Sequence, residues 1–335
     1  MKKFVFITLL LLGTATLGLK NYFQQSLQLV LPYPSGYLEI KPGDNLSSLC
    51  AQWQQAGWLH AADCQRLKVQ SVLQPQLRQL KAGVYPISSS RVAQVLALLR
   101  SGKVAQFSLQ LLEGQTLAQN FQALGNLPYL QQDVADLAAL QALLQWPTAW
   151  GAPVNAEGLL LPETYFYSGH SRLSQVLLRA HKALIQQVEQ QWQTRAADLP
   201  LKTPYELLIL ASIIEKESSH LPEKPLVASV FVNRLRQNMR LQTDPTVIYG
   251  LGERYQGDIK REHLKDPHPY NTYVHNGLPP GPISLISSSS LKAAAQPAVS
   301  DKLYFVAKGD GTHQFSSTLA EHNAAVRQYI FGKKP

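Results

Sequence analysis

The chain has 335 residues, of which 16% are charged, and its formal net charge at pH 7 is +9. This length is sufficient for one large core or for two domains. The mild positive charge suits an anionic polymer or an anionic membrane surface, and because the basic residues form no long run, we expect no nucleic-acid partner.

The N-terminal segment from Phe4 to Leu19 is apolar or small, with lysines on both sides. Sixteen helical residues cover about 24 Å, slightly less than the hydrocarbon core of a bilayer, about 30 Å, and flanking lysines can reach the interface. We predict an uncleaved single-pass anchor over residues 1–20, which places the rest of the chain outside the cytoplasm. A cleaved signal peptide is the alternative. Residues 21–35, with two prolines, are predicted to form a short linker.

A small α+β unit is predicted over residues 36–105. The expected elements are a strand at 37–40, helices at 45–54 and 61–68, a returning strand at 83–87 and a helix at about 91–99. This order, opened by the turn Pro42-Gly43-Asp44, resembles a LysM module, a small fold associated with glycan binding. A generic α+β unit explains the pattern as well.

The chain contains two cysteines, Cys50 and Cys64. In an oxidising compartment they can form a disulfide, and otherwise they are two buried free thiols. The sequence leaves both possibilities open.

Residues 106–200 are predicted to contain one strand followed by helices. We expect the strand at 106–111 and helices at 116–124, 133–144 and 171–192. The apolar positions of the last helix repeat with the 3.6-residue period, which indicates core packing rather than a cofactor site. The sequence has no Walker loop, Rossmann fingerprint or nucleophile elbow, so we predict no cofactor.

The segment from residue 203 to residue 217 is the most informative helix of the sequence. Thr203 is a good N-cap, Pro204 suits the first turn, and Glu206 is placed for a capping box. The following run Leu207–Ile214 is apolar apart from one serine, which predicts a helix buried on every side. The helix ends in Glu-Lys-Glu, where its dipole disfavours negative charge, so a desolvated carboxyl there is suited to act as a general acid.

Two acids compete for this role, Glu215 and Glu217, and a solvated helix end is the plainer interpretation of both. One turn before Glu217 lie the bulky Ile213–Ile214, whereas one turn before Glu215 lie the smaller and more polar Ala211–Ser212. The spacing therefore favours Glu217 as the acid with the raised pKa. Glu215 is the reserve candidate.

The remaining chain is expected to build a site around this helix. A second helical segment is predicted to follow and to extend to about residue 250, and residues 251–281 form a long polar loop, as active-site loops do. The histidines of the loop lack ligand spacing, so no metal site is predicted. A helix at about 287–294, a hairpin at 303–316 and a last helix from Thr318 complete an α+β chain.

Several ordered segments together resemble the YceG-like (MltG) family of endolytic murein transglycosylases. The resemblance covers residue 36 to the C-terminus, together with the N-terminal anchor. The matching segments are 157–165, 211–217, 230–235, 242–250, 270–273, 277–283 and 304–323.

The resemblance implies a LysM-like subdomain at 36–105 and a catalytic transglycosylase domain at 106–335, held at the bacterial inner membrane with the catalytic domain periplasmic or extracytoplasmic. It further implies cleavage of the β-1,4 bond between N-acetylmuramic acid and N-acetylglucosamine in nascent peptidoglycan, leaving 1,6-anhydro ends, with Glu217 as catalytic acid. Peptidoglycan synthases (penicillin-binding proteins) are the implied partners. Two alternatives stay open: a muramidase that uses water, and a non-catalytic peptidoglycan-binding scaffold for the synthases.

The predicted substrate-binding residues are polar or aromatic groups suited to sugar hydroxyls and N-acetyl groups, or to the carboxylates of stem peptides. They are Gln242, Asp244, Tyr249, Tyr270, Asn271, Arg240 and Glu163. The plainer interpretation is that the Asp-Pro and Tyr-Asn pairs among them only build turns.

Overall fold

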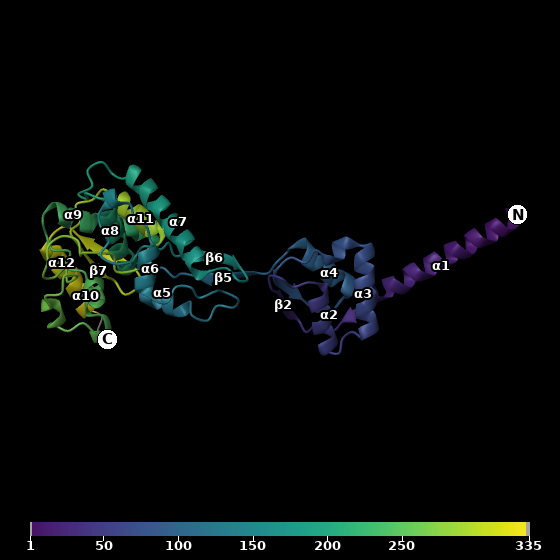
Figure 1. The fold of residues 1–335 in the computed structure, drawn as a ribbon. Coiled ribbons are helices and arrows are strands. Elements are labelled where there is room, and N and C mark those ends of the chain that lie inside the picture. Colours follow the sequence, from purple (N-terminus) through teal and green to yellow (C-terminus); the bar gives the residue numbers. More distant parts are fainter. Residues whose placement is uncertain (1, 333–335) are drawn as a thin grey trace. The chain divides into compact units, whose positions relative to one another are not determined.

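The computed structural model describes residues 2–332, and the side chains of residues 13–332 (Figure 1). Met1 and residues 333–335, at the ends of the predicted anchor and catalytic domain, lie outside the described residues. Two compact units are present. The first contains the residues up to Phe107 with Pro128–Leu130 and Phe166–Ser171, and the second contains the rest of the chain. The mixed α+β class is confirmed.

The first unit is built on the antiparallel pairs β1–β4 and β2–β3. Its elements are α1 (Lys2–Gln28), β1 (Val30–Leu31), β2 (Gly36–Ile40), α2 (Leu46–Gln55), α3 (Ala61–Leu73), β3 (Gly83–Ile87), β4 (Ser90–Arg91) and α4 (Val92–Ser101). Trp53 and Tyr85 are among its fully buried side chains. The predicted strand–helix–helix–strand order is confirmed, whereas the LysM-like assignment stays a prediction.

Helix α1 extends beyond the predicted anchor. It continues to Gln28, and β1 follows at Val30–Leu31, so regular structure occupies much of the segment predicted as a linker. Among the residues that the structure describes, no helix is long and apolar enough to cross a membrane. The predicted anchor is not confirmed.

Cys50 and Cys64 are buried free thiols in the structure. The Cys64 thiol donates to the Cys50 carbonyl over 3.5 Å. Burial raises the pKa of Cys50 to about 12, which makes it a poor nucleophile.

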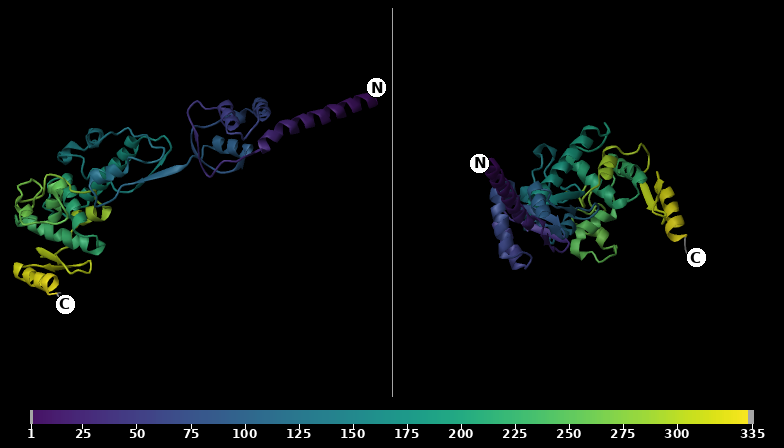
Figure 2. Two further views of the ribbon diagram at one scale, coloured as in Figure 1. Left: turned by 90° about the horizontal axis from the view of Figure 1, so that it is seen from below. Right: turned by 90° about the vertical axis from the view of Figure 1, so that its right-hand side faces the viewer.

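The second unit is mainly helical and carries the paired strands β7–β8, whereas the residues of the β5–β6 pair are divided between the two units. From residue 106 onward the elements are β5 (Gln106–Gln110), α5 (Leu117–Ala123), α6 (Leu137–Leu143), β6 (Thr164–Ser168), α7 (Leu173–Gln193), α8 (Pro204–Glu217), α9 (Lys224–Arg236), α10 (Asp244–Leu251), α11 (Ser288–Ala295), β7 (Tyr304–Ala307), β8 (His313–Ser316) and α12 (Leu319–Val326). The β7–β8 hairpin contacts α12, and both views of Figure 2 show them together near the C-terminus.

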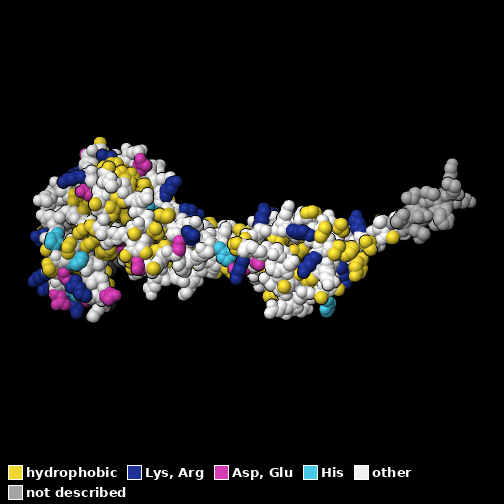
Figure 3. All heavy atoms as spheres, viewed as in Figure 1, with side chains coloured by type: hydrophobic (Ala, Val, Ile, Leu, Met, Phe, Trp, Pro, Cys, Tyr) yellow, Lys and Arg dark blue, Asp and Glu magenta, His cyan; other side chains and the backbone are white. Residues whose placement is uncertain are grey.

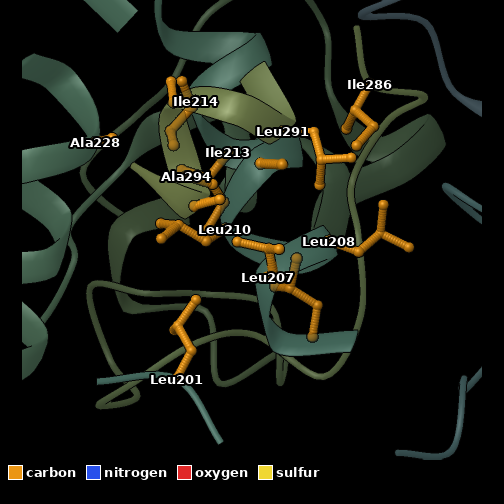
Figure 4. Close-up of a cluster of buried hydrophobic side chains, with 14 of the residues drawn as sticks. Leu201, Leu207, Leu208, Leu210, Ile213, Ile214, Ala228, Ile286, Leu291 and Ala294 are labelled. Atoms are coloured by element: carbon orange, nitrogen blue, oxygen red, sulfur yellow. The ribbon is translucent and has the colours of Figure 1, made fainter. Parts of the chain in front are cut away.

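Helix α8 forms the centre of this unit. The Thr203 hydroxyl accepts the Glu206 N–H over 3.2 Å at its start, and every residue from Leu207 to Ile214 is at most 3% exposed. Helices α7, α9 and α11 pack around it. In Figure 4, side chains of Ala228 in α9 and of Leu291 and Ala294 in α11 surround α8. The predicted buried helix is confirmed.

Two helix predictions were wrong in their extent. Helix α6 begins at Leu137 instead of residue 133, because Asp136 caps it while the Asp133 carboxylate accepts the backbone N–H of Ser174. The helical segment expected to extend to residue 250 is two helices. Between α9 and α10 the backbone of Asn238 and Gln242 has positive φ, which a helix does not permit.

The charged side chains of the visible face are scattered over both units, as Figure 3 shows. Lys and Arg form no continuous patch on that face. This agrees with the even distribution of basic residues in the sequence.

Candidate active site

A groove of about 380 Å³ lies at the C-terminal end of α8. Six elements contribute side chains to it: α8, α9, α10, α12, the loop before α11 and the β7–β8 hairpin. The lining residues are Glu217, Phe231, Arg234, Leu241, Gln242, Asp244, Tyr273, Tyr304, Phe305, Leu319 and His322. Aromatic rings and polar side chains therefore surround two carboxyl groups, Glu217 at the end of α8 and Asp244 at the start of α10.

Glu217 is partly buried in this groove, and the Thr243 hydroxyl donates a hydrogen bond to its Oε1. Burial raises the pKa of Glu217 to about 7. The Thr243 hydrogen bond opposes the rise, the negative charge of Asp244 adds to it, and the positive charge of Arg234 reduces it. A carboxyl group with this pKa is present in both protonation states near neutral pH, so it can donate a proton and later accept one.

Glu215 lies outside the groove, in a buried ion pair. Its Oε2 is 3.3 Å from Lys224 Nζ, and the two side chains are 6% and 3% exposed. The backbone N–H of Ser287 also donates to Oε2 over 2.9 Å. Burial alone would raise the pKa of Glu215, but the Ser287 hydrogen bonds and the charge of Lys224 outweigh it and lower the pKa. The prediction that Glu217 has the raised pKa is confirmed.

Arg234 supports one side of the groove and was missed by the sequence analysis. It is buried, its Nε donates to the Leu303 carbonyl over 2.7 Å, and its Nη1 donates to the Leu241 carbonyl over 2.8 Å. Its guanidinium lies over the Tyr304 ring, 5.1 Å from the centroid. Its position in the mainly apolar run 230–235 could have indicated this role. An arginine in such a run is expected to be buried, and a buried cation needs fixed hydrogen-bond partners.

The start of α10 places two predicted residues in the groove, Gln242 and Asp244. Asp244 Oδ1 accepts the Tyr273 hydroxyl over 2.7 Å. Gln242 has φ +49°, and its backbone N–H donates to the Thr272 carbonyl over 3.2 Å. Because a non-glycine residue in this conformation is strained, the surrounding contacts must hold Gln242 there.

His322 of α12 is a second groove residue that the sequence analysis missed. Its ring stacks on Tyr304 with centroids 5.2 Å apart. Burial, together with the charge of Arg234, lowers the pKa of His322, so the imidazole is neutral at pH 7. Its Nδ1 is buried and has no hydrogen-bond partner within the described part of the chain. His322 lies in the segment 304–323 that resembles the family, but the sequence pattern predicts no role for it.

The aromatic pair Tyr249 and Tyr270 lies at the other end of α10, outside the groove lining. Their ring centroids are 4.8 Å apart, and the Tyr249 hydroxyl is 3.4 Å from Glu157 Oε2. Helix α10 therefore lies between this pair and the groove that contains Glu217. The substrate-binding roles predicted for both tyrosines stay predictions.

The other three predicted residues also lie outside the groove lining. Asn271 is 1% exposed and donates to the Asp266 carbonyl over 2.7 Å, so it organises the 251–281 loop. Arg240 is exposed, and its Nη1 donates to the Tyr273 carbonyl over 3.1 Å. Glu163 is an exposed residue whose backbone carbonyl accepts the Leu111 N–H. Their substrate contacts stay predictions.

The fold and the groove together define a candidate acid–base site. A rigid helix presents one carboxyl group of near-neutral pKa to a polar and aromatic groove, an arrangement suited to protonating an oxygen atom that leaves a saccharide.

Comparison with known proteins then identifies the family. The sequence model of the YceG-like family matches residues 38–328, so the chain belongs to the YceG-like family. The resemblance inferred from the motifs is confirmed.

Similar proteins carry names that describe an activity on the cell wall. An endolytic murein transglycosylase of Bacillus subtilis is 39% identical over 180 residues, covering 53% of this chain and 49% of that protein. One of Streptococcus pneumoniae is 27% identical over 286 residues, covering 76% of this chain and 51% of that protein. The chain thus spans about half the length of the curated relatives it matches.

A solved structure shares the architecture. A putative YceG-like protein of Listeria monocytogenes superposes with a TM-score of 0.53 at 31% sequence identity, covering 87% of this chain and 99% of that chain. The comparison supports the YceG-like fold described above.

Proposed function

We propose that this chain is an endolytic peptidoglycan lytic transglycosylase that cleaves the β-1,4 bond between N-acetylmuramic acid and N-acetylglucosamine without water. The observation that carries the proposal is Glu217, a carboxyl group whose pKa is raised to about 7 in a polar and aromatic groove. The names of the similar bacterial proteins support the same substrate.

The proposed reaction uses Glu217 twice. Its protonated form gives a proton to the glycosidic oxygen as the C1–O bond breaks and the N-acetylglucosamine leaves. The resulting carboxylate then takes the proton from the O6 hydroxyl of the muramyl residue, and O6 bonds to C1. The product is a 1,6-anhydro end. Because the nucleophile belongs to the substrate, no second protein carboxylate is needed, unlike a two-carboxylate glycosidase.

Mass analysis of the ends released from purified, un-crosslinked glycan strands tests this proposal. We expect 1,6-anhydromuramyl ends from the wild-type protein. Reducing ends in the product would instead show a muramidase that uses water. A wild-type protein that cleaves no strands would favour the non-catalytic, peptidoglycan-binding scaffold.

One observation favours the muramidase as the second candidate. Asp244 is a second carboxylate in the same groove, and it raises the pKa of Glu217. A water-using enzyme needs such a base or nucleophile, whereas the transglycosylase does not. The Asp244→Asn variant should therefore retain anhydro-end formation if the first candidate holds, and should lose most hydrolysis if the second does.

The pH dependence of cleavage follows from Glu217. The group must start protonated, and its pKa is about 7, so kcat/KM should be highest below pH 7 and should fall about tenfold per pH unit well above it. Initial rates from pH 5 to pH 9 measure this profile. A rate that is flat across pH 7 would remove Glu217 as the rate-controlling acid.

Removal of the Thr243 hydroxyl should shift this profile. The hydroxyl stabilises the ionised form of Glu217, so Thr243→Val should raise the pKa further. A hydrogen bond to a charged group contributes about 1.5–3 kcal/mol, so the alkaline limb should move up by about one pH unit or more. Thr246→Val, three residues further along in α10, is the control, because its hydroxyl bonds the Thr243 carbonyl and Thr272 instead of Glu217. An unchanged limb in Thr243→Val would contradict the assignment.

We further propose that residues 1–20 anchor the chain in the inner membrane, that residues 36–105 bind glycan as a LysM-like subdomain, and that peptidoglycan synthases are partners. The lysines on both sides of the apolar segment and the matched strand–helix–helix–strand order support the first two points. Membrane fractionation of the full-length chain before and after removal of residues 1–20 tests the anchor.

A further inference from the structure

A second and larger cavity, about 670 Å³, lies at the far end of α10 from the groove. It is formed by α5, α6, residues 155–157, the end of α10 and the residues that follow α10, and Figure 1 shows α5, α6 and α10 as neighbours. Most of its lining is apolar or neutral, with contributions from Leu117, Leu137 and Ile248.

A buried carboxyl group, Glu157, lines this cavity. It is 6% exposed, and its Oε1 accepts the backbone N–H of Leu117 over 2.8 Å. The Tyr249 hydroxyl is 3.4 Å from its Oε2. Burial raises the pKa of Glu157 to about 7, in spite of these hydrogen bonds. No described side chain forms an ion pair with Glu157, although buried carboxylates in proteins are usually paired.

The charges of the cavity have one sign. Among the described residues that line it, the charged side chains are Glu157 and, at the exposed edge, Glu253, while lysine, arginine and histidine are absent. The chain as a whole carries a net charge of +9, so an acidic lining is unexpected. The rings of Tyr249 and Tyr255 also line the cavity, and aromatic faces attract cations.

We propose that this cavity binds a primary ammonium group carried on an aliphatic chain. The apolar lining accommodates the methylene groups, the tyrosine rings lie beside the cation, and Glu157 provides the negative charge. The ligand thereby supplies the positive partner that Glu157 lacks among the described residues. Neutral ligands of the same shape would leave the carboxylate unpaired.

The source of the ammonium group is the peptide attached to the glycan strand, an assignment that rests on the proposed function. Helix α10 forms a wall of both sites, with Asp244 in the groove and Tyr249 in the cavity. Its eight residues span about 12 Å. A branched substrate can therefore place a sugar beside Glu217 and the aminoalkyl end of its un-crosslinked peptide beside Glu157.

The binding test uses n-pentylamine, with 1-pentanol as the neutral isostere, followed by NMR or calorimetry on the full chain at pH 8. We expect saturable binding of pentylamine in the millimolar range and at least tenfold weaker binding of pentanol. Binding of pentylamine should weaken as the pH falls from 8 to 6, because Glu157 takes up a proton. The neighbouring Tyr205 and Tyr270 have pKa values raised to about 12 by burial, and burial also raises that of Tyr249, so the three phenols stay neutral over this range.

Three variants make the test specific. Glu157→Gln should weaken pentylamine binding at least tenfold, and Ala138→Trp, at an exposed lining position, should block the cavity without touching Glu157. Glu189→Gln, an exposed residue of α7, should bind as the wild type does. Equal binding of amine and alcohol, or binding that survives both Glu157→Gln and Ala138→Trp, would overturn the proposal.

A second experiment tests the source on the Glu217→Gln variant, so that cleavage plays no part. A disaccharide-peptide with a free aminoalkyl side chain should displace pentylamine, and its N-acetylated form should not. If neither displaces it, the peptide assignment is wrong, and a lysine side chain of a protein partner becomes the occupant. Failure of the proposed function would instead appear as wild-type protein that releases no anhydro ends while pentylamine still binds.

Discussion

Glu217→Gln should reduce the rate of glycan cleavage by about 10²–10⁴-fold while leaving the fold intact. The amide has nearly the same shape as the acid but cannot donate a proton to the glycosidic oxygen, and general acid catalysis contributes a factor of this size. Glu217 is partly exposed to the groove and forms no ion pair among the described residues, so neutralising it leaves no buried charge without a partner. The measurement is kcat/KM on un-crosslinked strands, with circular dichroism to verify the fold.

The matched control for this variant is Glu189→Gln, which changes the same functional group at an exposed position of α7. It should cleave at the wild-type rate. If Glu217→Gln retained full activity, Glu217 would have no part in the mechanism, and the groove would be left without a general acid.

Lys224→Met should destabilise the protein by about 3–5 kcal/mol, because removal of one partner leaves Glu215 as an uncompensated buried charge. Lys224 Nζ also donates to the hydroxyls of Ser287 and Ser289, over 3.2 and 3.1 Å, so the variant loses several contacts between α9 and the start of α11. Equilibrium denaturation by urea at pH 7 measures the loss as a lower midpoint with an unchanged slope.

The double variant Glu215→Gln/Lys224→Met separates charge from packing. It removes both members of the pair, so it should recover much of the stability lost in Lys224→Met. The pH response gives a second check. Because the pKa of Glu215 is lowered on folding, its contribution to stability is present above the unfolded pKa, near 4.5, and is lost as the pH falls through the folded value. If the single and double variants were equally unstable, the ion pair would not be the cause.

The central helix and its acid could be predicted because their signals are local. Thr203 and Pro204 define the start of α8, and the apolar run that follows predicts burial on all sides. The choice of Glu217 over Glu215 followed from the residues one turn earlier. Both inferences use neighbours within four positions along the chain, where helical geometry fixes which side chains meet.

The rest of the site depends on contacts between residues far apart in the sequence. The partner of Glu215 at Ser287 lies 72 positions away, and Arg234 bonds a carbonyl 69 positions away. Nothing in the local pattern predicts these pairings. The same limit explains Tyr249, because the sequence predicts a helix at that position but neither the break before α10 nor the direction in which α10 presents the side chain. The fold class was therefore within reach of the sequence, whereas the full groove was not.

The packing of α8 has a consequence for how the groove accommodates substrates. Because neighbours cover the run Leu207–Ile214 on every side, the helix cannot move unless the core opens, and the acid that follows this run is held in advance where the proposed reaction needs it. The opposite wall is different. The strands β7 and β8 are mostly half-buried, and α12 buries little beyond Ala325. On the proposed function, glycan strands of varied decoration would meet one fixed wall that carries the general acid and one less buried wall that can adjust to their substituents.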